Sequence, residues 1–216
     1  MSGVFLAGGA AAALFASALA GPTLDLEPAP TAPSERIQVG INTVNGSGCP
    51  AGTAAVAVSP DNTAFTVTYS DYLAQVGVGA APTDARKNCQ LNLAVRVPHG
   101  FTYAIASVDY RGYAYLENGA TGLQKAQYYF QGSAQTASAT HRFSGPYDSN
   151  WHTTDKTEVG ELVWAPCGVE RNFNINTELR VDSGDSGKDT TSFMTMDSTD
   201  GAVSTVYHIA WKKCES

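Results

Sequence analysis

The sequence predicts an exported, all-β protein whose single domain is a β-sandwich or jelly roll with two disulfides. Three observations predict this class: short runs in which apolar and polar residues alternate, turn dipeptides between those runs, and an even number of cysteines behind an apolar N-terminal stretch. The chain has 216 residues, which suits one all-β domain, and we expect residues 35–216 to form it.

The composition is that of a folded protein, with 43% hydrophobic and 15% charged residues. The formal net charge is −7, from 20 acidic and 13 basic residues. Nucleic-acid backbones and anionic membrane surfaces both need a basic partner. We therefore expect neither of them to be a ligand.

The N-terminal region reads as an export signal followed by a linker. Residues 4–20 are apolar, Ala-rich and uncharged, and they end in Ala18-Leu19-Ala20, the small-x-small pattern of a secretory cleavage site. These 17 residues are interrupted by glycines and are marginal for crossing about 30 Å of hydrocarbon, so we expect no stable membrane insertion after cleavage. The prediction is a signal peptide over 1–20, a Pro-rich leader over 21–34, and an extracellular mature protein.

All four cysteines lie behind the expected cleavage point, at Cys49, Cys89, Cys167 and Cys214. An even count in an exported chain predicts two disulfides. Three connectivities are possible, and we favour Cys49–Cys89 with Cys167–Cys214 because each pair then closes one half of the domain. Zinc is the alternative, but the chain has no C-x-x-C and no histidine at ligand spacing from a cysteine. We expect no metal and no other cofactor.

Alternating runs define the strands. Phe65, Val67 and Tyr69, for example, alternate with threonines, which is typical of a half-buried strand. Asn45-Gly46, Asn118-Gly119 and Asp200-Gly201 are hairpin turns, because both residue types tolerate positive φ. Many short strands without a helical period favour a sandwich or jelly roll. The strands are expected near residues 37–44, 53–58, 63–69, 88–97, 102–117, 123–131, 136–143, 151–157, 161–165, 171–182, 191–198 and 202–212.

Motifs for catalysis or metal binding are incomplete. Gly184-Asp185-Ser186-Gly187 matches the nucleophile tetrapeptide of trypsin-like proteases, but no histidine has the sequence context of their base, and Lys188 replaces a glycine needed at the oxyanion hole. Three aspartates in the same loop are spaced by three and four residues, unlike a calcium-binding loop. Glu158 and Glu161 would face opposite sides of a strand, so they cannot form a glycosidase pair. We interpret these features as solvated loops and surface charge.

The best ligand-binding candidates are aromatic. Within Tyr110-Arg111-Gly112-Tyr113-Ala114-Tyr115, one strand face carries Arg111, Tyr113 and Tyr115, and the other carries Tyr110. Flat rings beside an arginine suit sugars or aromatic ligands, although tyrosine is also an ordinary strand residue that packs on its neighbours. Gly112 inside this strand predicts a bulge or a close backbone approach.

A second pair of candidates, Tyr147 and Trp151, is expected in a loop, where aromatic side chains are more available to ligands. The predicted ligand-binding set is therefore Arg111, Tyr113, Tyr147 and Trp151.

Several segments together resemble a family of exported proteins of unknown function from filamentous bacteria and fungi. They are residues 88–103, which begin Asn88-Cys89-Gln90, then 110–113, 163–168 and 174–180, and the resemblance extends over about residues 37–214. It implies secretion, a β-rich fold and paired cysteines. It implies no catalytic residue, since that family has no established activity.

We interpret the chain as a secreted, non-enzymatic β-sandwich that binds an extracellular glycan or a component of the cell envelope. Two alternatives remain open: an extracellular hydrolase whose active site is assembled from distant strands, and a structural matrix protein. A planar row of exposed rings would favour the binding protein. Two carboxyls, or a histidine with an acid, that converge in a cleft would favour the hydrolase.

Overall fold

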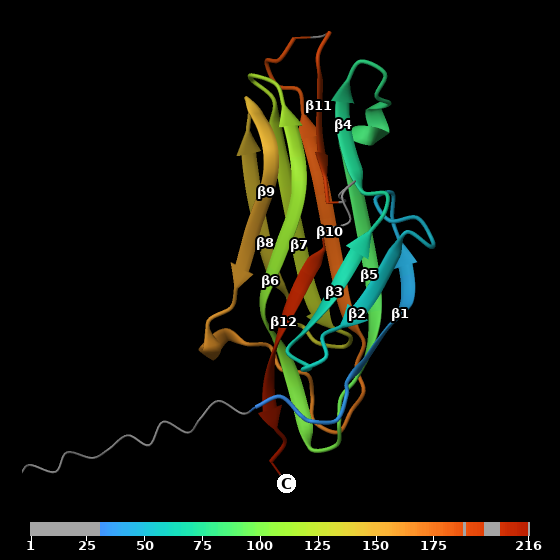
Figure 1. Cartoon of the computed structure of the whole chain (residues 1–216), viewed down its shortest axis with the longest axis vertical. Helices are drawn as coiled ribbons and strands as arrows, with labels where there is room; N and C mark the ends of the chain where they lie inside the picture. The colour runs from blue at the N-terminus through green and yellow to red at the C-terminus, as the bar shows by residue number, and fades with distance from the viewer. Residues whose placement is uncertain (1–30, 188, 197–203, 216) are drawn as a thin grey trace, which may run out of the picture.

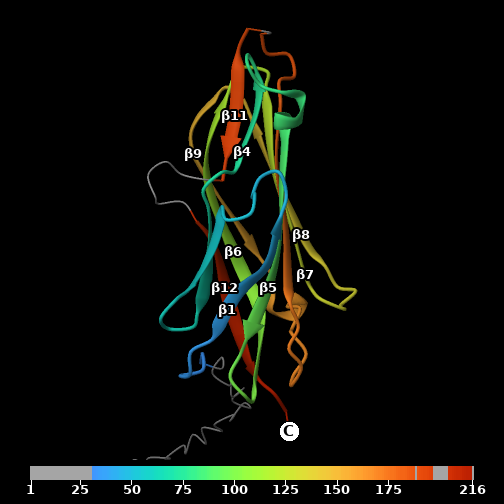
Figure 2. The same cartoon turned by 90° about the vertical axis from the view of Figure 1, so that its right-hand side faces the viewer.

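The computed structural model describes residues 31–187, 189–196 and 204–215, and it is an elongated sandwich of two β-sheets (Figures 1 and 2). The all-β class predicted from the sequence is confirmed. The predicted signal peptide, most of the predicted leader and the turn expected at Asp200-Gly201 lie outside the described residues. Within the described ranges, no helix is long and apolar enough to span a membrane.

The two sheets are built from antiparallel pairs. The five-stranded sheet has the order β1 (Gln38–Asn45), β5 (Arg86–Arg96), β10 (Phe173–Asp182), β7 (Thr121–Phe130) and β8 (Ala137–Ser144). The seven-stranded sheet has the order β2 (Ala54–Val58), β3 (Ala64–Tyr69), β12 (Thr205–Lys213), β6 (Phe101–Leu116), β11 (Thr191–Thr195) and β4 (Leu73–Gly77), and β9 (Tyr147–Lys156) pairs with the other side of β6.

The short connection between β8 and β9 passes from one sheet to the other. β8 pairs with β7 at an edge of the five-stranded sheet, whereas β9 pairs with β6 in the seven-stranded sheet. Both strands lie on the same side of the sandwich, on the left in Figure 1. This side therefore has two strand edges facing each other across the space between the sheets.

Aromatic rings fill the middle of the core. The rings of Phe65 and Tyr207 stack with their centroids 4.8 Å apart, and Phe173 meets both of them edge-on. These residues come from β3, β12 and β10, where every second side chain is buried. Period-two alternation therefore places one row of each strand in the core, as expected for a sandwich.

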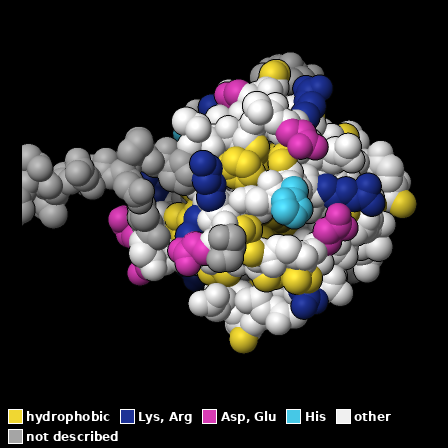
Figure 3. All heavy atoms as spheres, turned by 90° about the horizontal axis from the view of Figure 1, so that it is seen from below, with side chains coloured by type: hydrophobic (Ala, Val, Ile, Leu, Met, Phe, Trp, Pro, Cys, Tyr) yellow, Lys and Arg dark blue, Asp and Glu magenta, His cyan; other side chains and the backbone are white. Residues whose placement is uncertain are grey.

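Two disulfides close the molecule, in the sequential order expected from the sequence. Cys49–Cys89 is buried and ties the segment after β1 to β5. Cys167–Cys214 ties the β9–β10 connection to the segment after β12, beside a hollow of about 620 Å³ at the lower end. In the view from below, hydrophobic side chains gather across this end, with charged side chains around them (Figure 3).

Four sequence-based predictions are wrong. The chain turns at Asn45-Gly46 and at Asn118-Gly119, but neither turn is a hairpin, because β1 pairs with β5 and not with β2, and β6 and β7 belong to different sheets. β4 was not expected, because it is only five residues long and has a weak apolar pattern. Residues 161–165 form no strand: the chain makes one 3-10 turn at Val159–Glu161 and then continues without regular structure. β9 overlaps the strand expected near 151–157 but begins at Tyr147, so Tyr147 and Trp151 lie in a strand and not in a loop. The outward side chains of β9 are all polar, and some of its inward side chains are polar too, so the alternation of apolar and polar residues that marks a strand is weak in this segment.

Candidate functional site

The outer surface of the seven-stranded sheet carries a row of three rings, which we call the aromatic face and define as Tyr113, Tyr115 and Phe193. Tyr113 and Tyr115 project outward from β6, as the sequence predicts, and Phe193 lies opposite Tyr115 on β11. The centroid of the Phe193 ring is 5.9 Å from that of each tyrosine, and the interplanar angles are 33° and 26°. The rings are half-buried and only moderately tilted, so together they form a broad apolar surface open to solvent.

Both tyrosine hydroxyls are fixed by carboxylates. The Tyr113 hydroxyl donates to Asp148 on β9, and the Tyr115 hydroxyl donates to Glu117 Oε1 at 2.8 Å. Each hydrogen bond, together with the negative charge of its acceptor, raises the pKa of the tyrosine, which therefore stays a neutral donor. The result is a set of oriented rings bordered by acceptor oxygens.

Gly112 brings β11 against β6 at this site. A Cβ at this position would lie 1.9 Å from the Thr195 backbone oxygen and 2.5 Å from Cζ2 of the Trp151 ring. The close backbone approach predicted for Gly112 is thus confirmed. Because Thr195 is two residues after Phe193 on β11, this contact also sets how near Phe193 lies to the tyrosines.

A polar cluster continues along β6 below the rings. Asp109 accepts a hydrogen bond from Thr154 at 2.5 Å, and its carboxylate lies 2.8 Å from Nε2 of His208 and 3.5 Å from Nε2 of His152. Partial desolvation raises the pKa of Asp109, but these hydrogen bonds and the nearby histidines outweigh it and leave the pKa below its ordinary value. No group of three or more His, Cys, Asp and Glu in the described part of the chain is arranged to hold a metal ion.

The predicted ligand-binding residues do not all come together. Arg111 and Tyr113 share the outer face of β6, and Arg111 is exposed. Tyr147 and Trp151 belong to the opposite row of β9, and both rings pack on Phe143 of β8. Trp151 is only 2% exposed, so its ring is part of the core and does not reach the aromatic face.

Sequence reasoning missed Phe193, Asp148 and Glu117. Phe193 is the one aromatic residue of β11 and points outward, whereas Met194 beside it is buried. Phe193 pairs with Tyr115 across two strands that are far apart in the chain, and no local sequence pattern predicts such a pairing. Asp148 belongs to a polar stretch whose sequence predicts a loop, so no local pattern marks it as a site residue.

A second feature lies between the sheets, and we call it the inter-sheet cleft. It is a cavity of about 310 Å³ on the β8–β9 side, lined mainly by β6, β7, β8 and β9, with Tyr128 and Asp155 among its residues. Asp155 Oδ1 is 2.6 Å from Nε2 of His141. A histidine and an acid therefore meet beside a cleft, but among the described residues no serine, threonine or cysteine side chain is hydrogen-bonded to His141.

Several polar atoms in this part of the interior have no hydrogen-bond partner. They include Asp155 Oδ2, the Tyr128 hydroxyl and Thr153 Oγ1, and each is shielded from solvent. An unpartnered buried polar group costs about 1–3 kcal/mol of folding free energy. Such groups call for an explanation, and a bound ligand is one.

Comparison with known proteins places the chain in a family. Residues 35–214 match the family described as Domain of unknown function (DUF4360). A protein of the fungus Arthroderma benhamiae, named "Uncharacterized secreted protein", is 38% identical over 172 residues, which are 80% of this chain and 69% of the fungal protein.

Similarity to solved structures is weak. The enzymatically active domain of bacteriophage CBA120 tailspike protein 4 gives a TM-score of 0.26 at 12% identity, over 80% of this chain but only 19% of the tailspike chain. The top component of cowpea mosaic virus also gives 0.26, at 10% identity, over 87% of this chain and 94% of the viral chain. These values support no inference about function.

Proposed function

The chain belongs to the DUF4360 family, and we propose that it is an extracellular, non-enzymatic protein whose aromatic face binds a glycan of the surroundings or of a cell envelope. The observation that carries this proposal is the row of Tyr113, Phe193 and Tyr115 on an outer sheet surface. The secreted fungal relative supports the extracellular location.

The chemistry of the aromatic face matches that of a sugar. One side of a pyranose ring presents C–H groups, which pack on the electron-rich face of an aromatic ring, while its edge presents hydroxyls that must keep hydrogen-bond partners. On this surface the rings supply the apolar contact. Asp148 and Glu117 supply acceptors, and Arg111 supplies donors beside Tyr113.

The position of the rings favours binding over catalysis. A general acid or base works best in a concave site that excludes water and tunes its pKa. The aromatic face is instead an open sheet surface, and its two carboxylates are each engaged by a tyrosine hydroxyl. The hydrolase alternative is favoured by the His141–Asp155 pair beside the inter-sheet cleft, which Glu161 also lines.

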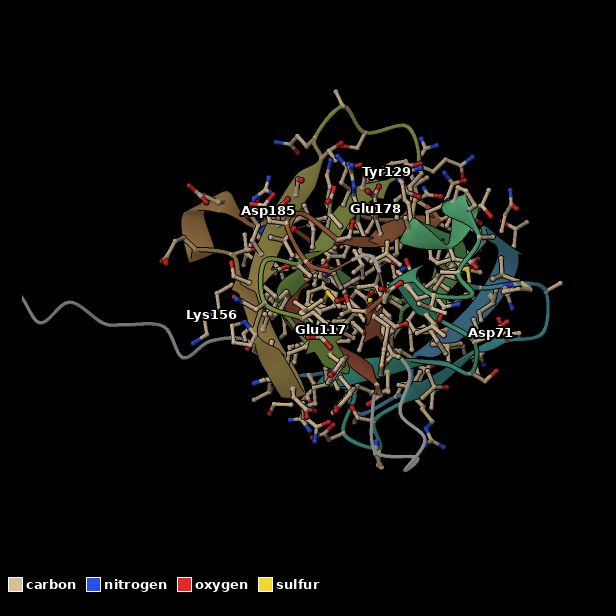
Figure 4. All side chains as sticks on the ribbon, turned by 90° about the horizontal axis from the view of Figure 1, so that it is seen from above. Asp71, Glu117, Tyr129, Lys156, Glu178 and Asp185 are labelled. Atoms are coloured by element: carbon tan, nitrogen blue, oxygen red, sulfur yellow. A yellow bond between two sulfur atoms is a disulfide. The ribbon has the colours of Figure 1, made fainter. Side chains whose placement is uncertain are left out.

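The test is a pull-down of the mature protein on a panel of insoluble polysaccharides and peptidoglycan, with the supernatant assayed for released sugar. We expect retention without release, and about a tenfold loss of affinity in Tyr113→Ala and in Phe193→Ala, which corresponds to about 1.4 kcal/mol per ring. Tyr129→Ala is the matched control, because Tyr129 lies on β7 of the five-stranded sheet and well apart from Glu117 in Figure 4.

Three outcomes would overturn the proposal. Release of sugar would make the protein a hydrolase. Retention that survives Tyr113→Ala and Phe193→Ala equally with the control would place the binding surface elsewhere. No retention on any member of the panel would refute glycan binding, and capture of an envelope protein would then replace it.

A further inference from the structure

The inter-sheet cleft combines apolar walls with one anionic end. Val108 of β6, Phe130 of β7 and Phe173 of β10 are buried side chains that line it, together with Ala139 of β8 and Val163. Its volume of about 310 Å³ is at the lower end of the range for small-molecule sites. Apolar walls with a few convergent polar groups are typical of such sites.

The anionic end is Asp155. One carboxylate oxygen, Oδ1, is 2.6 Å from Nε2 of His141, and the other, Oδ2, is buried without a hydrogen-bond partner. An ionised carboxylate only accepts hydrogen bonds, so its free oxygen can be satisfied only by a donor. Within the described residues no hydrogen bond of ordinary geometry reaches this oxygen, although the Tyr128 hydroxyl interacts with the Asp155 carboxylate.

Tyr128 stands beside that oxygen. The residue is 7% exposed, it lines the cleft, and its hydroxyl has no hydrogen-bond partner. Burial raises the pKa of Tyr128 well above its ordinary value, and the charge of Asp155 raises it further, so the hydroxyl stays protonated.

We propose that the inter-sheet cleft is a binding site for a small apolar molecule that carries one protonated amine. The apolar body would lie between Val108, Phe130 and Phe173, and the ammonium group would donate to Asp155 Oδ2 and to the Tyr128 oxygen. An ammonium has three donors and a positive charge, so it satisfies both acceptors and pairs with the carboxylate. This site is separate from the aromatic face and does not depend on glycan binding.

The cleft has access from solvent on the side of β8 and β9. Lys156, the last residue of β9, and Glu161, which follows in the 3-10 turn, both line its rim. Figure 4 shows Lys156 at this side of the molecule, apart from Tyr129 and Glu178 on the five-stranded sheet. A ligand would therefore enter between two strand edges without the sheets having to separate.

The test uses the folded mature protein and three probes of one size: 2-phenylethylamine, 2-phenylethanol and phenylacetate. Isothermal titration calorimetry at several temperatures should show binding of the amine with a negative heat-capacity change, from burial of its ring. We expect at least tenfold weaker binding of the alcohol and none of the acid. Equal binding of the amine and the alcohol, or no binding of the amine, would overturn the proposal without the need for any variant.

Two near-isosteric variants then locate the site. Asp155→Asn removes the charge and should weaken amine binding at least tenfold, whereas Asp148→Asn, on the outward row of the same strand, should leave it unchanged. Tyr128→Phe removes only the hydroxyl and should weaken amine binding by a smaller factor. If Asp155→Asn fails to fold, Tyr128→Phe and the probe series still decide, and amine binding unaffected by Tyr128→Phe and Asp155→Asn would refute the assignment.

Discussion

Replacement of Gly112 by alanine is expected to destabilise the protein strongly, although it adds a single methyl group. The new Cβ would lie 1.9 Å from the Thr195 backbone oxygen, whereas real Cβ atoms essentially never approach another heavy atom within 3.0 Å. β11 would therefore have to move by more than about 1 Å away from β6. The Trp151 ring, with an atom 2.5 Å from the same Cβ, would also have to shift.

The magnitude follows from what must move. Overpacking in a dense core typically costs about 1–3 kcal/mol. The obstacle here is a backbone oxygen, which cannot rotate away as a flexible side chain could, so we place the loss at about 3 kcal/mol. For a domain of this size each kcal/mol lowers Tm by about 2–4 °C, and the expected decrease in Tm is therefore about 6–12 °C.

Gly40→Ala is the matched control for this experiment. Gly40 also lies within a strand, β1, but a Cβ there would meet no atom within 4 Å. This variant should be neutral or slightly more stable, since alanine restricts the unfolded chain. Urea unfolding followed by tryptophan fluorescence measures both variants, and equal midpoints for Gly112→Ala and Gly40→Ala would refute the close-approach reasoning.

Three further predictions concern stability. Asn62 is 2% exposed, and its amide nitrogen donates to the backbone oxygens of Pro33 and Glu35, both at 2.8 Å. Asn62→Asp replaces this donor with a carboxylate oxygen and should lower the unfolding free energy at neutral pH by about 3 kcal/mol. An unchanged urea midpoint would contradict this prediction. Hydrogen bonds from Ser59 and Thr63 lower the pKa of Asp61 from 3.8 to about 2. Because the pKa is depressed in the folded state, this stabilisation is complete above about pH 5 and is lost as the pH falls toward about 2, so urea unfolding across that range should show a shallower acid-side slope in Asp61→Asn than in the wild type. Conversion of Cys49 and Cys89 together to serine should cost about 2–5 kcal/mol in urea unfolding, and a smaller loss would mean that the Cys49–Cys89 disulfide constrains the unfolded chain little.

The parts of the fold that follow local rules could be predicted from the sequence. Period-two alternation located most strands, and it placed Arg111, Tyr113 and Tyr115 outward from β6 with Tyr110 inward. The even cysteine count gave two disulfides, and their sequential order proved right. The strand predictions depend only on residues that are neighbours in the chain, and the disulfide prediction chooses among only three possible connectivities.

The remaining parts depend on contacts between distant segments. Phe193 joins the tyrosines only because β11 pairs with the upper half of β6, where Gly112 allows a close approach to Thr195. Trp151 sits in a polar stretch and is buried because β9 lays it over Gly112 and against Phe143. The first half of β9 resembles a loop because Asp148, Ser149 and Asn150 are consecutive polar residues, so only its second half was expected as a strand.

The polar inward positions Thr153 and Asp155 are the reason to treat β9 as the functional strand. A strand directs successive side chains to opposite faces, so β9 presents Asp148 to the aromatic face and Asp155 to the inter-sheet cleft. An apolar residue at 155 would complete the core and remove an unpartnered buried oxygen, yet an aspartate stands there. Because the two rows point to opposite faces, the double variant should bind the glycan like Asp148→Asn and the amine like Asp155→Asn. Weaker binding of either ligand by the double variant than by the matching single variant would mean instead that β9 moves as a unit and that one site controls the other.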